Sequence, residues 1–221
     1  MSSIVVPAKL LTVVQLIPAL HSGGAERSAL EIARALVQAG HRSVVISAGG
    51  RLVEQLQAEG SEHVMLDMGR KSLRTLLRLG ALRRLLRDLK PDIVHARSRL
   101  PAWLGWWALS GVSPRPHFVT TVHGLNSPGR YSAILLRGER VIAVSQTMRD
   151  FVLSHYKWLE PAKVRVIPRG IDPEAFPYGH RPEDAWQKAF FAEYPTLAGA
   201  PLLTLPARGT RLKGHHDAIE L

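Results

Sequence analysis

Short runs of valine, isoleucine and leucine recur along the chain as far as Pro168, and stretches with a helical spacing of apolar positions separate them. The first run, residues 11–17, is mostly apolar at consecutive positions, which is typical of a strand buried on both faces of a sheet. Later runs resemble it. The pattern predicts strands at residues 11–17, 43–48, 63–68, 91–97, 117–124, 140–145 and 163–168.

Strands that alternate with helices predict an α/β fold built on a doubly wound parallel sheet. Ligands of such sheets bind outside the carboxyl ends of the strands, where the strand order reverses. Any single histidine here could have a purely structural role, with its hydrogen bonds satisfied inside the protein. Polar residues at several corresponding strand ends, however, favour a shared site. The candidates are Gly23, Gly24, His95, His123, Gly124 and Ser145.

The stretch from Ser22 to Leu36, SGGAERSALEIARAL, joins the first two predicted strands. Apolar residues from Ala29 onward recur at helical spacing, so the stretch is a strand-to-helix turn followed by a helix. Glycines let a ligand approach the backbone, and the N–H groups of the first helical turn favour an anion. Gly23 and Gly24 are therefore candidate contacts of an anionic ligand, although turn geometry alone also accounts for two glycines.

The formal net charge of +11 indicates anionic partners such as lipid headgroups, phosphorylated small molecules or nucleic acid. Leucines before and after Gly80 fall on opposite sides of a helical wheel, so we expect a break or kink there. There are two interpretations of Arg83, Arg84 and Arg87: they form a solvent-exposed polar face of a helix, or they contact an anionic membrane. Nucleic acid is disfavoured, because no aromatic residues interleave with the basic ones. The basic residues concentrate at Arg70, Lys71, Arg74, Arg78, Arg83, Arg84, Arg87 and Lys90.

The chain has no cysteine among its 221 residues, which excludes disulfides and thiolate zinc sites. The apolar N-terminal segment lacks a basic start and a small-residue cleavage site, so we interpret it as a strand and not as a signal peptide. No apolar run approaches the ~20 residues of a membrane span. We expect a cytoplasmic protein, with the inner face of a membrane as an optional peripheral contact.

The sequence changes character at Pro168. A Pro- and Gly-rich linker precedes a helix, and a second strand–loop–helix pattern then begins. His215 and His216 are adjacent, a spacing that does not suit metal ligands on a helix. We expect a first domain at 1–167, a linker and crossover helix at 168–200 and the incomplete start of a second α/β domain at 201–221. Within that start we expect a strand at Leu202–Leu205 and a helix from about Gly214.

Together these segments resemble the family 4 glycosyltransferases, retaining enzymes with two Rossmann-like domains in the GT-B arrangement. The resemblance extends from about Lys9 to the last residue. The segments that carry it are SGGAE (22–26), PDIVHAR (91–97), TTVHG (120–124), VIAVSQTMRD (141–150), VIPRGID (166–172) and PARGTRLKG (206–214).

The resemblance implies a donor that is a nucleotide-diphosphate sugar. It implies that Gly23, Gly24, Arg208 and Lys213 bind this donor and that His123 is catalytic, close to the transferred sugar. It further implies that Glu26, His95 and Ser145 line the site, and that neither an enzymic nucleophile nor a metal cofactor is required. Positive charge at the leaving diphosphate stabilises the transition state more than the ground state.

Two residues depart from the family pattern: Arg169 stands where asparagine is usual, and Ala207 replaces a common glycine. The family binds the nucleoside largely through its second domain, so we expect this chain to be truncated and inactive alone. A lipid-linked glycan or lipopolysaccharide core is the expected acceptor. The alternative is a catalytically silent membrane- or partner-binding module. A nicotinamide-dependent oxidoreductase is disfavoured, because the first turn reads Ser-Gly-Gly and no acid follows the second strand.

Overall fold

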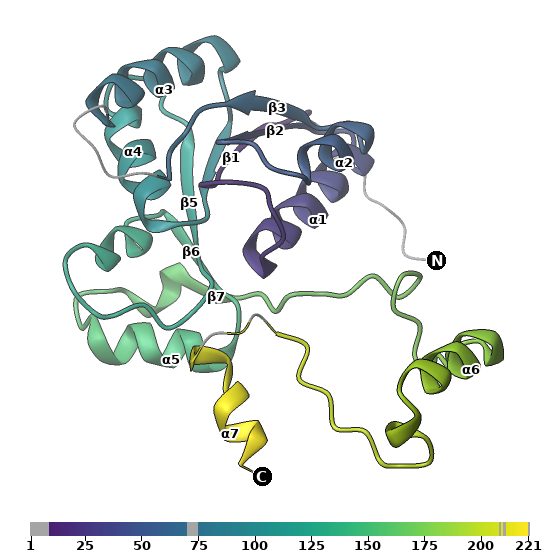
Figure 1. Ribbon diagram of the computed structural model, residues 1–221. Coiled ribbons are helices and arrows are strands. Elements are labelled where there is room, and N and C mark those ends of the chain that lie inside the picture. The colour runs from purple at the N-terminus through teal and green to yellow at the C-terminus, as the bar shows by residue number, and fades with distance from the viewer. Residues whose placement is uncertain (1–8, 70–74, 208, 210, 221) are drawn as a thin grey trace. The chain divides into compact units, whose positions relative to one another are not determined.

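A computed structural model of the chain describes residues 9–69, 75–207, 209 and 211–220. The chain divides into two compact units, Met1–Arg169 and Gly170–Leu221. The first unit contains a seven-stranded sheet in the order β3-β2-β1-β4-β5-β6-β7 (Figure 1). Its strands are β1 (Thr12–Leu16), β2 (Arg42–Ser47), β3 (Glu62–Met65), β4 (Ile93–Ala96), β5 (His117–Val122), β6 (Arg140–Ala143) and β7 (Val164–Val166).

Every neighbouring pair of strands is parallel. All seven predicted strands are present, and the doubly wound α/β fold is confirmed. The strand order reverses between β1 and β4, so the segments that leave these two strands diverge at the carboxyl edge of the sheet. The connecting elements are α1 (Gly24–Gln38), α2 (Val53–Ala58), α3 (Thr75–Leu89), α4 (Arg99–Leu109), η1 (Ser132–Leu136), α5 (Gln146–His155) and η2 (Pro161–Lys163).

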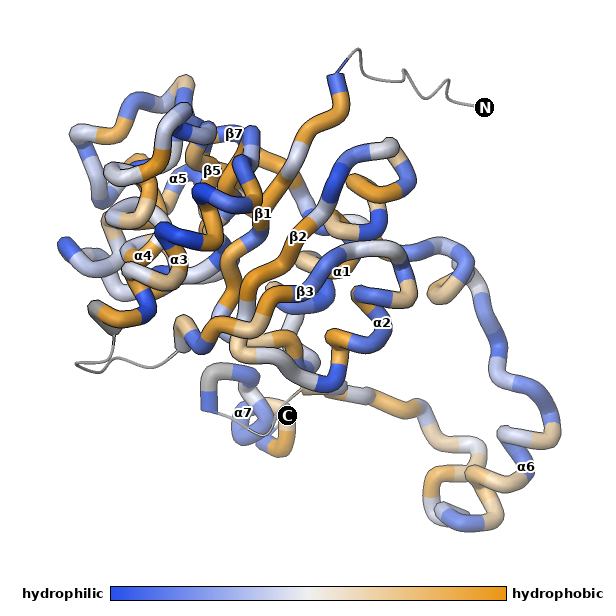
Figure 2. The backbone as a smooth tube through the Cα atoms, turned by 90° about the horizontal axis from the view of Figure 1, so that it is seen from above, coloured by the Kyte–Doolittle hydropathy of each residue, from blue (hydrophilic) through white to orange (hydrophobic). Residues whose placement is uncertain are grey.

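Helices cover both faces of the sheet. Val44 and Ile46 of β2 pack in a large cluster with residues of α3, α4 and α5, whereas Val45 packs with Ala29 and Leu56 from α1 and α2. Alternate residues of one strand thus point to opposite apolar layers, which is why the strands read as continuous apolar runs. In Figure 2 the hydrophobic colour follows β1 and β2 through the middle of this unit.

The expected break at Gly80 is absent, because α3 is helical without interruption from Thr75 to Leu89. Leu82 and Leu86 are buried, and Leu79 packs against the same cluster, so one face serves the whole helix. Leu77 on another side is 76% exposed. The error lay in assuming that every leucine of the helix must be buried. Residues 70–74 of the basic region lie outside the described residues.

The second unit contains no β-strand among its described residues, so the strand expected at Leu202–Leu205 is not formed. A strand requires a hydrogen-bonded neighbour, and no described segment pairs with these residues. Trp186 and Phe190 stack along α6 with ring centroids 5.1 Å apart. The elements of this unit are α6 (Asp184–Glu193), η3 (Pro195–Leu197), η4 (Arg211–Lys213) and α7 (His215–Ile219). The described part of the chain has no helix with the length and apolar character needed to cross a bilayer.

Candidate functional site

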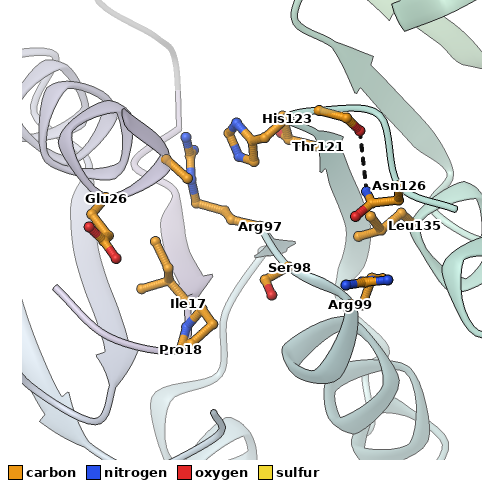
Figure 3. A pocket seen from close by; sticks show the side chains of 12 residues that line it. Ile17, Pro18, Glu26, Arg97, Ser98, Arg99, Thr121, His123, Asn126 and Leu135 are labelled. Atoms are coloured by element: carbon orange, nitrogen blue, oxygen red, sulfur yellow. Dashed lines mark hydrogen bonds between the residues drawn. The ribbon is translucent and has the colours of Figure 1, made fainter. Parts of the chain in front are cut away.

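A cavity of about 270 Å³ opens at the carboxyl ends of β1, β4 and β5 in the first unit. It lies at the reversal of strand order, where ligands of doubly wound sheets bind. Arg97, directly after β4, donates its backbone N–H to the carbonyl of Leu16 at 3.0 Å, and beyond this bond the two chain segments separate. The lining residues are Ile17, Pro18, Ala25, Glu26, Arg97, Ser98, Arg99, Thr121, His123, Gly124, Asn126 and Leu135 (Figure 3).

Arg97 is a buried cation whose hydrogen-bond partners are all neutral. The side chain is 3% exposed, and it donates from Nη1 to Gln15 Oε1 at 3.1 Å and from Nη2 to Ser28 Oγ at 2.7 Å. Its Nε has no partner within the described part of the chain. Burial, followed by the charge of Arg169, lowers the pKa of Arg97 to about 10, while the carboxylate of Glu31, which is not bonded to it, acts in the other direction, so the guanidinium stays charged at neutral pH. A buried charge without a bonded counter-ion favours an anionic ligand.

Gln15 sets the position of that guanidinium. It is fully buried in β1, and its Nε2 donates to the carbonyl of Ala29 in α1 at 3.0 Å, which leaves Oε1 facing Arg97. Our sequence predictions did not include Gln15, Ser28 or Arg97 among the site residues. Two signals were present: a glutamine inside an apolar strand, and a serine on the otherwise apolar face of α1.

His123 lies directly after β5 and is half-buried at the cavity. Its Nδ1 accepts a hydrogen bond from Arg169 Nη2 at 2.9 Å. Burial, together with the positive charges of Arg97 and Arg169, lowers the pKa of His123 to about 3. The imidazole is therefore neutral at physiological pH. In the view of Figure 3, the side chain of Arg97 lies between His123 and Glu26.

His95 lies beneath the cavity and does not line it. The ring is 5% exposed, and its Nε2 is hydrogen-bonded to Thr121 Oγ1 at 2.7 Å. Burial, with the positive charge of Arg97 as the next cause, holds the pKa of His95 well below its ordinary value. Thr121 does line the cavity, so His95 reaches the site only through that hydroxyl. Its predicted direct role stays a prediction.

The Gly-Gly turn begins α1, with Gly23 as the N-cap. Glu26 accepts hydrogen bonds from the backbone N–H groups of Gly23 and of Ser22, the latter at 2.8 Å. The N–H groups of Gly24 and Ala25 belong to the first helical turn and have no acceptor within the helix. A Cβ on Gly24 would lie 2.6 Å from Arg169 Nη1, so glycine is what lets the guanidinium lie against the helix start.

Other predicted site residues have structural partners or lie elsewhere. Ser145 caps α5 by accepting from the N–H of Met148 at 3.1 Å and is not part of the cavity lining. Lys213 is exposed on η4 of the second unit. Arg208 lies outside the described residues. The expected pairing of these two cations with the Gly-Gly turn stays a prediction.

Two of the three arginines predicted to contact a membrane bind the end of a neighbouring helix. Arg83 donates to the carbonyls of Trp107 at 3.1 Å and Ala108 at 3.4 Å, and Arg87 donates to that of Gly111 at 2.9 Å. Cations at a helix C-terminus satisfy its free carbonyls and complement its dipole. Arg84 is exposed. Among the described residues, no group of His, Asp and Glu side chains is arranged to hold a metal ion.

A comparison with protein families matches residues 22–175 to Glycosyltransferase Family 4. The chain belongs to this family. The match includes the Gly-Gly turn and the carboxyl ends of β4 and β5, two of the three strands that surround the cavity, and it begins after the end of β1. No sequence among the curated proteins matches the chain significantly.

Solved structures give the same fold for this family 4 chain. A glycosyltransferase from Rickettsia africae has 32% sequence identity and a TM-score of 0.79, over 96% of this chain and 56% of that one. Anabaena Alr3699/HepE in complex with UDP-glucose has 16% identity and a TM-score of 0.74, over 95% and 56%. WaaG, a glycosyltransferase involved in lipopolysaccharide biosynthesis, has 14% identity and a TM-score of 0.55, over 83% and 51%. The chain spans little more than half the length of these proteins.

Proposed function

We propose that the first unit provides one side of the active site of a retaining glycosyltransferase and binds a phosphate group of its nucleotide-diphosphate sugar donor. The observation that carries this proposal is Arg97, a buried guanidinium at the cavity whose bonded partners, Gln15 and Ser28, are both neutral. An anion in the cavity would offset the cost of burying that charge.

The groups around the cavity suit a ligand that is rich in acceptor oxygens. Arg97 Nε and the N–H groups of Gly24 and Ala25 are donors, and the exposed guanidinium of Arg169 adds a second cation. When the bond from sugar to diphosphate breaks, negative charge develops on the leaving oxygen. Donors and cations already in place stabilise that charge without reorganisation. We assign no enzymic nucleophile, because none is needed when the acceptor attacks the sugar from the same face that the diphosphate leaves.

The comparisons support a nucleotide-sugar donor at the level of fold and family. Alr3699/HepE has been crystallised with UDP-glucose, with UDP and glucose, and with UDP. WaaB and WaaG are described as enzymes of the lipopolysaccharide outer core and of lipopolysaccharide biosynthesis. We propose a lipid-linked glycan or a lipopolysaccharide core as the acceptor of this chain, in keeping with its net charge of +11.

The donor proposal is tested by titrating UDP, inorganic pyrophosphate and uridine into the chain while recording amide and arginine signals by NMR. We expect UDP and pyrophosphate to shift the signals of Gly24, Ala25 and Arg97 Nε, and uridine to leave them unchanged. Arg97→Lys should reduce the response, whereas Arg84→Gln, a change at an exposed arginine of α3, should not. Equal responses to uridine and UDP would contradict the proposal.

Membrane contact through α3 is tested on acidic liposomes. Arg84 is the natural position to change, because it is exposed and Arg83 and Arg87 bind carbonyls after α4. Arg84→Glu should release the protein from vesicles that contain phosphatidylglycerol, while Arg149→Gln on α5 should not. Retained binding in the first variant would mean that α3 does not carry the contact.

A further inference from the structure

Arg169 determines which nitrogen of His123 carries the proton. A guanidinium has only N–H donors and no acceptor, so in the 2.9 Å contact the Nη2 of Arg169 must donate and the Nδ1 of His123 must accept. A neutral imidazole has a single N–H. Because Nδ1 uses its lone pair toward Arg169, the proton of His123 is on Nε2.

The Nε2 of His123 is the atom that faces no partner. It is buried, and within the described part of the chain nothing is hydrogen-bonded to it. Buried polar atoms are rarely left without a partner, and an orphaned one at a ligand cavity indicates a place for a ligand atom. An N–H donor requires an acceptor, so the missing partner is an oxygen with a free lone pair.

The charges around His123 favour the same neutral tautomer. Arg97 on the β4 side, Arg169 after β7 and the neighbouring His95 are the titratable groups that act on it. A proton added at Nδ1 would remove the acceptor of Arg169 and place a third positive charge beside two guanidinium groups. Burial acts in the same direction, and together these causes hold the pKa of His123 near 3.

Gly24 is required for this arrangement. Arg169 Nη1 would be 2.6 Å from a Cβ at that position, so any side chain on Gly24 would displace the guanidinium. The side chain of Arg169, in the segment after β7, therefore contacts both the start of α1 and the end of β5. Figure 3 shows the imidazole of His123 on the side of the cavity that β5 provides.

We propose that Arg169 is a positioning residue that fixes His123 as the Nε2–H tautomer, so that the cavity offers a neutral hydrogen-bond donor to a substrate oxygen. His123 then has no free lone pair with which to act as a general base. That the oxygen belongs to a hydroxyl of the transferred sugar rests on the proposed function. The tautomer and its dependence on Arg169 do not.

The experiment is ¹⁵N NMR of the histidine rings in the uniformly labelled chain, with the His123 signals identified by their loss in His123→Gln. Protonated and unprotonated ring nitrogens have well-separated ¹⁵N shifts. We expect Nδ1 of His123 to show the shift of an unprotonated nitrogen and Nε2 that of a protonated one. Both should stay constant between about pH 5 and 8, where an ordinary histidine titrates.

Arg169→Met removes the donor and the charge but keeps an unbranched, flexible side chain, although a shorter one. It should move the Nδ1 shift toward that of a mixture of tautomers and raise the pKa of His123. Arg169→Lys, which keeps both a donor and the charge, should restore the original shifts at least in part. Arg165→Met, at an exposed arginine of β7, is the matched control and should change neither.

A purely structural role for Arg169 would change stability but not the identity of the protonated nitrogen. A proton on Nδ1 in the unaltered chain would overturn the proposal, as would identical His123 shifts in the unaltered chain and in Arg169→Met. Neither outcome depends on glycosyl transfer, so the positioning role can fail while the proposed function stands. Equally, failure of the UDP titration leaves the tautomer measurement intact.

Discussion

Arg97 and Gln15 are 82 positions apart in the sequence, and a 3.1 Å hydrogen bond joins their side chains inside the first unit. The bond joins β1 to the residue that follows β4, and the sheet order reverses between these two strands. Gln15 is held in turn by the carbonyl of Ala29 in α1. The guanidinium at the cavity is therefore positioned by the interior of the sheet and not by a surface loop.

Removing both partners of this bond should cost less stability than the sum of the two single losses. Gln15→Leu removes an acceptor from the buried guanidinium of Arg97. We expect this change to lower the free energy of unfolding by about 2–4 kcal/mol. In Gln15→Leu with Arg97→Met, no buried charge remains, so the double variant should lose clearly less than the sum of the two single changes. Urea unfolding of the four proteins measures the coupling. Additive losses would show that the two side chains do not interact energetically.

Arg83 and Arg87 should stabilise the fold, while Arg84 should not. Because Arg83 and Arg87 donate to carbonyls at and after the end of α4, Arg83→Gln and Arg87→Gln should each lower the free energy of unfolding by about 1 kcal/mol. Arg84→Gln should stay within about 0.5 kcal/mol of the unaltered chain. Thermal or urea unfolding distinguishes these values. Equal effects at all three positions would contradict the capping role.

Stability should fall as the pH is lowered through about 6.5. Burial holds the pKa values of His63, His95 and His123 below their ordinary value of 6.5 in the folded chain. Below that pH the unfolded chain binds more protons than the folded one, so the contribution is complete above about pH 6.5 and is lost as the pH decreases. Each histidine that stays unprotonated when folded should add a slope of roughly 1.4 kcal/mol per pH unit.

Urea unfolding between pH 7.5 and 5 measures this slope, and His95→Gln should reduce it by about the contribution of one histidine. The pKa values of Glu62, Asp92 and Glu139 are also lowered in the folded chain, but these carboxylates affect stability in a different pH range. Those carboxylates stabilise the fold above their ordinary values of 3.8 to 4.5, and their contribution is lost only at lower pH. A flat profile from pH 7.5 to 5 would mean that the histidines are protonated in the folded chain.

Two glycines should differ in how much stability they lose on substitution by alanine. Gly24→Ala meets the end of a flexible arginine, so we expect a stability loss below about 1 kcal/mol together with displacement of Arg169 from His123. Gly50 has φ +142°, and a Cβ there would collide with the backbone carbonyl of Leu20. Gly50→Ala should therefore cost about 2–5 kcal/mol. Unfolding curves and the ¹⁵N shifts of His123 test the contrast.

The sequence by itself determined the order and the type of the elements in the first unit. The spacing of apolar residues is a local property, and a strand buried on both faces, such as β1, reads as an apolar run whatever its neighbours are. From the order of the elements alone, the rule that ligands bind at the carboxyl ends of parallel strands also predicts that the Gly-Gly turn and His123 lie at one edge of the sheet. The strand predicted at Leu202–Leu205 from an apolar run was wrong, because a strand depends on a hydrogen-bonded partner that an apolar run does not specify.

Only the tertiary structure decided what the polar residues at that edge do. The neutral partners of Arg97 come from Gln15 and Ser28, and Arg169 reaches His123 across 46 positions of sequence. Whether a charge is buried, and which nitrogen of an imidazole carries the proton, depend on atoms that packing brings together from distant parts of the sequence. No local spacing of residues encodes these contacts, so the buried cation and the fixed tautomer became visible only in the folded chain.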